Sequence, residues 1–269
     1  MRRARLDAEL VRRGLARSRG QAAELVAAGR VRVAGQVATK AATAVAADEP
    51  VIVDELVDDD GPHYVSRGGH KLAGALAAFK PRGLVVRDRR CLDAGASTGG
   101  FTDVLLREGA AKVIAVDVGY GQLAWSLRVD ERVVVVERTN VRELTTELIG
   151  GPVDVVVGDL SFISLRLVLP ALVAVCVADA DLVLMVKPQF EVGRERVGAG
   201  GVVRETEHRA DAVRSVAGAA AQLGYGTRGV VASPLPGPAG NVEYFLWLAA
   251  GAPPLAEADL SRAMAEGPS

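Results

Sequence analysis

The chain has 269 residues, of which 49% are hydrophobic and 24% are charged, and its formal net charge is −1. This composition excludes an intrinsically disordered chain, because it supplies enough apolar material for a folded core. The longest uncharged apolar run, residues 167–178, is shorter than the roughly 20 residues of a membrane-spanning helix. No signal-peptide pattern begins the sequence, and two cysteines make no disulfide framework, so we expect a soluble cytoplasmic protein.

The nearly neutral net charge hides an uneven distribution along the chain. Residues 1–47 contain ten lysines and arginines against three acids, whereas residues 48–60 contain seven acids and no base. A basic segment followed by an acidic one favours binding of a polyanion such as a nucleic acid. A solvated, arginine-rich surface without a partner is the alternative interpretation.

The first 60 residues predict a small α+β unit that ends in an acidic linker. Leucines at near-helical spacing predict a helix over residues 5–16. Ser18 and Gln21 form a capping-box pattern that opens a second helix, and Gly29 can terminate this helix. Alternating apolar residues predict short strands over residues 31–33, 37–39 and 51–53.

Beyond a linker at residues 58–62, the pattern changes to buried strands that alternate with helices. Runs of valine, isoleucine and leucine joined by helices predict a parallel α/β sheet that is covered on both faces. We predict an α/β domain over residues 61–250 and a flexible tail over residues 251–269. The expected strands are 91–93, 113–117, 133–137, 153–159, 182–187, 229–232 and 243–248, and the expected helices are 102–107, 123–127, 142–149, 165–177 and 204–223.

A glycine-rich loop follows the first strand of this domain and opens a helix. It reads Asp-Ala-Gly-Ala-Ser-Thr-Gly-Gly over residues 93–100, in the position where open α/β sheets bind ligands. The spacing differs from that of dinucleotide-binding and P-loop motifs. It looks like the S-adenosylmethionine site of class I methyltransferases, in which Asp117 would accept the ribose hydroxyls and Asn140 would border the adenine. The predicted cofactor residues are Asp93, Gly95, Ser97, Thr98, Gly99, Gly100, Asp117, Asn140 and Asp159.

Charged residues also stand at the ends of the fourth and fifth predicted strands. Asp159 and Lys187 each follow a buried strand, so both are expected over the mouth of the cofactor site. Methylation of a hydroxyl group requires a base, and a desolvated lysine that lies close to a second cation, such as Lys71, can be neutral enough to act as one. Glu243, at the start of the last strand, supplies a second carboxylate.

These four residues, Lys71, Asp159, Lys187 and Glu243, resemble in this order the Lys-Asp-Lys-Glu tetrad of FtsJ-like ribose 2′-O-methyltransferases. Their contexts, VSRGGHKL, DLSFIS, VKPQFE and GNVEYF, match as well. The resemblance implies a Rossmann-like class I methyltransferase fold in which Lys187 is the base on the 2′-hydroxyl and Asp159 orients it. Lys71 and Glu243 would tune the charge and hold the target ribose.

The segment from Arg5 to Val33 resembles an S4 RNA-binding domain. With the tetrad, the chain is similar to the TlyA family of rRNA 2′-O-methyltransferases, some members of which are called hemolysins. The resemblance implies S-adenosylmethionine as the methyl donor and rRNA within ribosomes or their subunits as the partner, with cytidines as targets. It leaves the target subunit and the oligomeric state open. The implied RNA-binding residues are Arg3, Arg5, Arg17, Ser18, Arg19, Arg30, Arg67 and His70.

Two other functions stay open on the sequence. A pore-forming hemolysin would need an export signal and a membrane-active segment, and the sequence shows neither. A catalytically silent ribosome-assembly factor would have lost motif residues that are present here. The three histidines, His63, His70 and His208, lack partners at ligand spacing, so we expect no metal site. Phe162 and Phe190 suit either base stacking or core packing, and we favour core packing.

Overall fold

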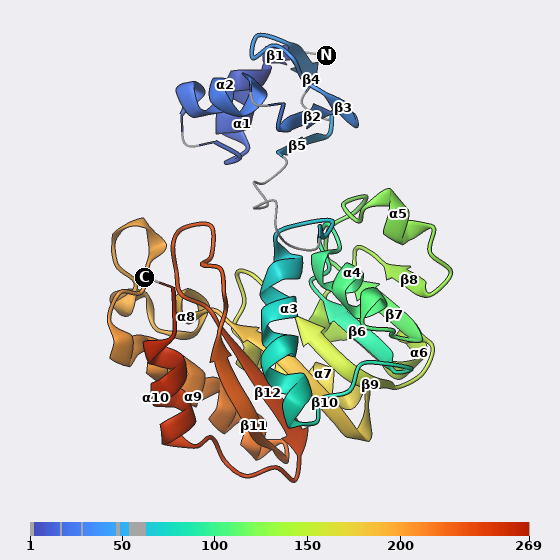
Figure 1. Cartoon of the computed structure of the whole chain (residues 1–269), viewed down its shortest axis with the longest axis vertical. Helices are drawn as coiled ribbons and strands as arrows, with labels where there is room; N and C mark the ends of the chain where they lie inside the picture. Colours follow the sequence, from blue (N-terminus) through green and yellow to red (C-terminus); the bar gives the residue numbers. More distant parts are fainter. Residues whose placement is uncertain (1–2, 17, 28, 47–48, 54–62, 269) are drawn as a thin grey trace. The chain divides into compact units, whose positions relative to one another are not determined.

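The chain divides into two compact units, Met1–His63 and Tyr64–Ser269, which are described separately below. The computed structural model describes residues 3–16, 18–27, 29–46, 49–53 and 63–268. The predicted linker at residues 58–62 and the predicted domain boundary after residue 60 fall outside these described residues. Figure 1 shows the helices and strands of both units with their labels.

The first unit is a small α+β fold with two helices and two small antiparallel sheets. Its apolar side chains, among them Leu6, Leu10, Val26 and Val31, form a core of their own. The elements are β1 (Arg3–Arg5), which pairs with β4 (Ala44–Ala46); β2 (Val31–Val33), which pairs with β3 (Gln36–Val37) and β5 (Val51–Val53); α1 (Leu6–Arg12); and α2 (Arg19–Ala27).

The sequence predicts the helices of this unit better than its strands. Helix α1 ends at Arg12, earlier than predicted, and Gly14 follows with a φ of +73°, a left-handed conformation that glycine adopts without strain. The predicted cap of α2 is present, since Ser18 Oγ accepts a hydrogen bond from Gln21 N at 3.2 Å. Strands β1 and β4 escaped prediction because their sequences, Arg-Ala-Arg and Ala-Val-Ala, contain fewer β-branched residues than β2 and β5, which are equally short.

The second unit is built around a seven-stranded, mostly parallel sheet in the order β11-β12-β10-β9-β6-β7-β8. Five neighbouring strands from β10 to β8 run parallel, and β12 runs antiparallel to both β10 and β11. The predicted Rossmann-like α/β fold is therefore confirmed. The strands are β6 (Arg90–Ala94), β7 (Lys112–Val116), β8 (Val133–Val136), β9 (Val153–Gly158), β10 (Cys176–Val186), β11 (Tyr225–Ala232) and β12 (Tyr244–Ala250).

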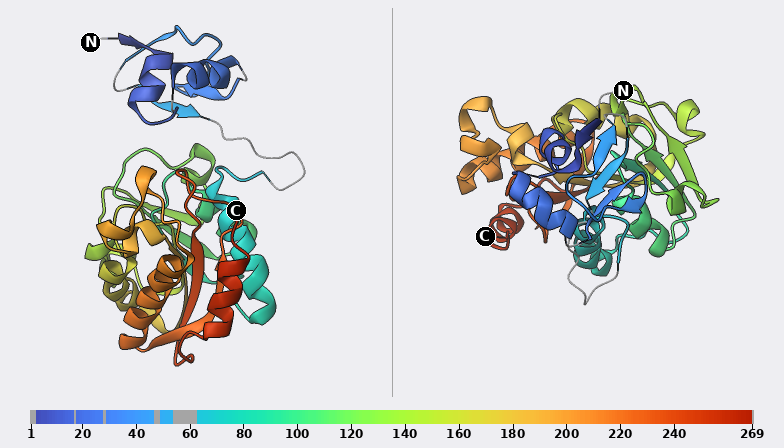
Figure 2. Two further views of the ribbon diagram at one scale, coloured as in Figure 1. Left: turned by 90° about the vertical axis from the view of Figure 1, so that its left-hand side faces the viewer. Right: turned by 90° about the horizontal axis from the view of Figure 1, so that it is seen from above.

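Helices cover both faces of this sheet (Figures 1 and 2). On β10, Leu182 and Leu184 belong to a core with α7, α9 and α10, whereas Val183 and Met185 belong to a core with α3 and α4. The strands are apolar on both faces because neither face meets water. The helices are α3 (Gly68–Phe79), α4 (Gly100–Arg107), α5 (Trp125–Arg128), α6 (Thr146–Ile149), α7 (Leu165–Ala174), α8 (Pro188–Glu191), α9 (Thr206–Gln222) and α10 (Glu257–Ala265), and the short 3-10 helices are η1 (Lys80–Arg82), η2 (Val141–Glu143), η3 (Arg194–Arg196) and η4 (Ala199–Gly201).

The prediction of a flexible tail over residues 251–269 is wrong for α10. Leu260 and Ala263 of this helix are each 1% exposed and complete the core on the α9 side of the sheet. Arg214 of α9 also forms an ion pair with Glu257 at 2.9 Å. The alanine- and proline-rich composition indicates a flexible segment. Two apolar residues on one face of a short helix can nevertheless stabilise it when they pack against a core.

Candidate active site

The glycine-rich loop joins β6 to α4 and packs closely against its neighbours. Gly95 has a φ of +87°, and a Cβ atom there would lie 2.7 Å from the backbone oxygen of Asp159. The amide nitrogens of Gly95 and Ala96 both donate to Val116 O, at 2.9 and 3.0 Å. Glycine at position 95 therefore allows the loops after β6 and β9 to touch.

Asp93 lies beneath this loop and is fully buried. Its Oδ2 accepts a hydrogen bond from Thr102 Oγ1 of α4 at 2.7 Å. Burial raises the pKa of the Asp93 carboxyl to about 7, and the negative charges of Asp159 and Asp117 act in the same direction. Asp93 thus holds the start of α4 under the loop and does not line the pocket described next.

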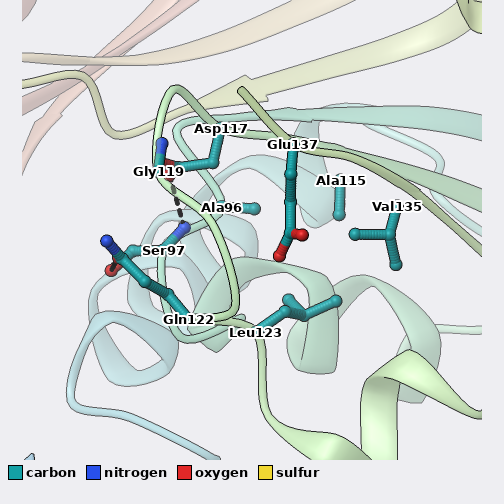
Figure 3. A pocket seen from close by; sticks show the side chains of 9 residues that line it. All are labelled: Ala96, Ser97, Ala115, Asp117, Gly119, Gln122, Leu123, Val135 and Glu137. Carbon is teal, nitrogen blue, oxygen red and sulfur yellow. Dashed lines mark hydrogen bonds between the residues drawn. The ribbon is translucent and has the colours of Figure 1, made fainter. Parts of the chain in front are cut away.

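A small pocket opens beside the loop, at the carboxyl ends of β6, β7 and β8 (Figure 3). Asp117 stands at its edge, where Oδ2 accepts from Ser97 N at 2.8 Å and Oδ1 accepts from Gly119 N at 2.6 Å. Glu137 is a second carboxylate in the lining, and it accepts hydrogen bonds from Arg128 and from Gly121 N. The remaining lining residues are Ala96, Ala115, Gln122, Leu123 and Val135.

The pocket contains some of the predicted cofactor residues and excludes others. Ser97 and Asp117 line it, whereas Asn140 is exposed and caps η2 by accepting a hydrogen bond from Arg142 N at 3.0 Å. Gly95, Thr98, Gly99 and Gly100 shape the loop without lining the pocket. Sequence reasoning missed Glu137 and Gln122 as lining residues. The signal for Glu137 was its place directly after the Val133–Val136 strand.

Lys71 and Glu243 form a buried ion pair. Lys71 lies on α3 and Glu243 directly precedes β12, and the distance from Lys71 Nζ to Glu243 Oε2 is 2.6 Å. The two side chains are only 7% and 1% exposed. A charge removed from water in this way is stable only with its partner in place.

Lys187 and Asp159 form the second pair of the predicted tetrad. Lys187 Nζ lies 2.6 Å from Asp159 Oδ1, and it also donates a hydrogen bond to Ser161 Oγ at 2.7 Å. Lys187 is 8% exposed. The sequence identified the tetrad but not Ser161, although this serine belongs to the quoted DLSFIS motif.

Strand register brings the two pairs to the same edge of the sheet. Val186 of β10 faces Tyr244 of β12, so Lys187 and Glu243 occupy neighbouring positions where these strands meet the edge. Leu184 of β10 likewise faces Gly158 of β9, which places Asp159 at the same level. The cation expected next to Lys187 was Lys71, but the partner that Lys71 contacts is Glu243.

The core-packing interpretation of Phe162 is wrong. Its side chain is 91% exposed, and its backbone has a φ of +63°, which is unusual for a residue with a side chain. The ring contacts that of the half-buried Phe190, with 5.3 Å between centroids. Two aromatic rings therefore stand beside Ser161 and Lys187 at the edge of the sheet.

The predicted RNA-binding residues fall on both units of the chain. In the first unit, Arg3 is exposed, Arg30 is half-buried, and Arg5 and Arg19 form ion pairs with Asp7 at 2.9 and 3.0 Å; Arg17 lies outside the described residues. In the second unit, Arg67 donates a hydrogen bond to Pro236 O, and the His70 ring meets the edge of Tyr64 at a centroid distance of 5.0 Å.

Neither a membrane-spanning helix nor a metal site is present in the part of the chain that the structure describes. Within the described part of the chain, no helix is long and apolar enough to cross a membrane. The described residues also hold no group of three histidine, cysteine or acidic side chains that could bind a metal ion.

The fold and the site define a Rossmann-like methyltransferase. Its N-terminal unit is a small domain of a type that binds RNA. The model of the FtsJ-like methyltransferase family matches residues 64–250, and that of the S4 domain matches residues 4–51. The chain therefore belongs to the FtsJ-like methyltransferase family, in the TlyA group that adds an S4 domain.

Individual relatives agree with this assignment. The chain is 62% identical to the 16S/23S rRNA (cytidine-2′-O)-methyltransferase TlyA of Mycobacterium tuberculosis, over 99% of both chains. It is 37% identical to Hemolysin A of Brachyspira hyodysenteriae, over 89% of this chain and 97% of that one. A solved structure described as "Putative hemolysin from Streptococcus thermophilus" superposes with a TM-score of 0.79 at 37% identity and covers 98% of this chain and 95% of that one.

Proposed function

We propose that this protein transfers a methyl group from S-adenosylmethionine to the ribose 2′-hydroxyl of a cytidine in rRNA. The observation that carries the proposal is the contact of 2.6 Å between Lys187 Nζ and Asp159 Oδ1, at the sheet edge next to the glycine-rich loop. The rRNA (cytidine-2′-O)-methyltransferase from Mycobacterium tuberculosis supports the choice of substrate.

The pocket between the ends of β6, β7 and β8 fits an adenosyl group. Asp117 and Glu137 offer carboxylate oxygens that accept hydrogen bonds from ribose hydroxyls, and the apolar side chains of Ala115 and Val135 can contact a ring. Bound S-adenosylmethionine supplies an electrophilic methyl group. Of the predicted cofactor residues, we assign contact to Ser97 and Asp117, and a supporting role to Asp93 and the loop glycines.

Lys187 is the group that removes the proton from the 2′-hydroxyl. Its amine accepts this proton in the unprotonated form, and Asp159 Oδ1, 2.6 Å away, orients it. Asp159 and Ser161 together hold the Lys187 amine in one orientation. The reaction is an in-line displacement, so this fixed orientation contributes as much as the proton transfer itself.

The Lys71–Glu243 pair has a different task in this proposal. It places a positive and a negative side chain beside Lys187 without adding net charge to the edge of the sheet. We assign the pair to the orientation of the target ribose. Lys71 and Glu243 can each give up part of their contact with the other and form a hydrogen bond with a hydroxyl group of the nucleotide instead. Lys71 and Glu243 therefore bind the substrate rather than move a proton.

The S4 domain supplies the electrostatic part of RNA recognition. Arg3, Arg5 and Arg19 present guanidinium groups that contact phosphates without reading sequence. Because the substrate is rRNA, within ribosomes or their subunits, we place the reaction in the cytoplasm.

The test is transfer of a labelled methyl group from S-adenosylmethionine to purified ribosomes and subunits, by the wild type and by Lys187→Ala. We expect label at a position that resists alkaline cleavage, and a rate on the order of 10² to 10⁴ fold lower in the variant. Lys80→Ala is the matched control, because Lys80 also pairs with a carboxylate, that of Glu108, but is exposed. Label on a base would contradict the tetrad assignment, and cofactor binding without any label would favour a silent assembly factor.

A further inference from the structure

Two loops carry the proposed catalytic pair, and they meet at the edge of the sheet. The loop after β9, which we call the Asp159 loop, spans residues 159–164 and leads into α7; the loop after β10 begins at Lys187 and continues into α8. Lys187 Nζ contacts both Asp159 Oδ1 and Ser161 Oγ of the first loop. The geometry of these contacts depends on how the two loops are held relative to each other.

Glu191, the last residue of α8, connects the same two loops a second time. Its Oε2 accepts a hydrogen bond from Ser164 Oγ at 2.5 Å, and its Oε1 accepts one from Leu165 N at 2.7 Å. The Arg166 side chain lies 3.5 Å from Oε2 and also donates to the backbone oxygen of Glu191. The Glu191 side chain is 1% exposed and that of Arg166 is 45% exposed, so the hydrogen bond from Leu165 N is shielded from water whereas the Arg166 contacts are partly solvated.

The Asp159 loop needs such support because its backbone is strained. Phe162 has a φ of +63°, a conformation that a residue with a side chain adopts only when its surroundings impose it. The ring itself is almost fully exposed, so core packing does not impose this conformation. The loop is held by hydrogen bonds at its two ends, to Lys187 and to Glu191, and by Leu160 and Ile163, which pack against the core.

We propose that Glu191 is a positioning residue for the methyl transfer. By holding Ser164 and Leu165 against α8, it sets the Asp159 loop at the distance at which Asp159 and Ser161 orient the amine of Lys187. The inference rests on the proposed function and adds to it a residue that does not touch the substrate. Burial raises the pKa of the Glu191 carboxyl, while the hydrogen bonds from Ser164 and Leu165 favour its charged form.

The test compares Glu191→Gln and Glu191→Ala with the wild type in methyl transfer to ribosomal subunits. In Glu191→Gln the side-chain oxygen can still accept from Leu165 N, but an amide group replaces the oxygen that accepts from Ser164. We therefore expect kcat to fall about tenfold in this variant, and further in Glu191→Ala. The KM for S-adenosylmethionine stays unchanged, since Glu191 does not line the cofactor pocket. The rates are measured well below the unfolding temperature of each variant.

The control is Asp181→Asn, in the middle of the same strand β10. Asp181 is also a partly buried carboxylate, and it accepts a hydrogen bond from Trp247 Nε1 at 2.7 Å. We expect this variant to lose stability and keep its kcat. A Ser164→Ala variant, alone and combined with Glu191→Gln, completes the test, because two residues that act through one contact give non-additive losses.

The outcomes separate this inference from the proposed function. If the wild type methylates ribose and Glu191→Gln has the same kcat, or loses no more than Asp181→Asn, Glu191 is a structural residue only and the inference is wrong. Additive losses from Ser164→Ala and Glu191→Gln would overturn it as well. If the wild type transfers no methyl group to ribose, the proposed function itself fails.

Discussion

The pKa values of buried carboxyl groups shift in opposite directions in the two units of the chain. In the first unit, hydrogen bonds from Arg5 and Arg19 to Asp7 hold the pKa of this carboxyl well below its usual range. Glu9 likewise accepts hydrogen bonds from two further arginines, which lower the pKa of its carboxyl to about 2. In the second unit, Asp93 accepts hydrogen bonds from the hydroxyl and the backbone of Thr102, a neutral residue, and burial raises the pKa of Asp93 to about 7.

The difference shows that hydrogen bonds from arginines outweigh burial at Asp7 and Glu9, whereas the neutral donor at Asp93 does not. A small unit keeps its carboxylates near the surface, where long arginine side chains reach them. A sheet that is covered on both faces removes Asp93 from any cation. The Lys71–Glu243 pair combines burial with an opposite charge, and so does Lys187 in its contact with Asp159.

The largest expected effect comes from Glu243→Gln, which leaves the Lys71 ammonium buried without a counter-charge. We expect the free energy of unfolding to fall by about 3–5 kcal/mol, measured by urea denaturation. Glu108→Gln is the control, since its pair with Lys80 is exposed and is worth at most about 1 kcal/mol. Equal losses in the two variants would show that burial does not distinguish these ion pairs.

Asp93→Asn tests the raised pKa through its pH dependence. The folded-state pKa lies above the unfolded value, so the wild type loses stability as the pH rises from about 4 to 7, while asparagine cannot ionise. The stability of the variant relative to the wild type is expected to increase by on the order of 3 kcal/mol over this range. Urea denaturation at a series of pH values measures it, and a constant difference would mean that Asp93 keeps an ordinary pKa.

Arg19→Ala separates structure from RNA binding in the first unit. Losing one exposed ion pair with Asp7 is expected to cost about 0.5 kcal/mol. If Arg19 also contacts a phosphate, the slope of log affinity for rRNA against log salt concentration falls by about 1. Asp7→Asn keeps the arginine and removes the pair, so it should leave this slope unchanged. An unchanged slope in Arg19→Ala would remove this residue from the RNA-binding surface.

The smallest effect is expected for Phe162→Ala. Its side chain is 91% exposed, so the free energy of unfolding should change by no more than about 0.5 kcal/mol. Phe245→Ala, at a fully buried residue of β12, is the contrasting variant, with an expected loss of about 3–5 kcal/mol. Thermal unfolding of the two variants compares them directly. A large loss from Phe162→Ala would restore the core-packing interpretation.

The sequence predicted the second unit more fully than the first. Its strands are runs of apolar residues whose ends are easy to recognise, so the sequence placed Asp117, Asp159 and Lys187 directly after strands, as the structure has them, whereas Asp93 lies inside β6. The strands of the first unit are two or three residues long, and two of them were missed. Helix α10 was missed because it has few apolar residues, and the helix is stabilised by the contact of these residues with the core of the second unit.

The sequence by itself determined the class of fold, the glycine-rich loop and the four residues of the tetrad. These depend on local periodicity and short motifs, which are encoded within a few neighbouring residues. Only the tertiary structure decided that Lys71 pairs with Glu243, 172 positions away, and Lys187 with Asp159. It also decided that Glu137 rather than Asn140 lines the pocket. The choice of partner depends on strand register and helix packing between distant segments, and no single segment carries that information.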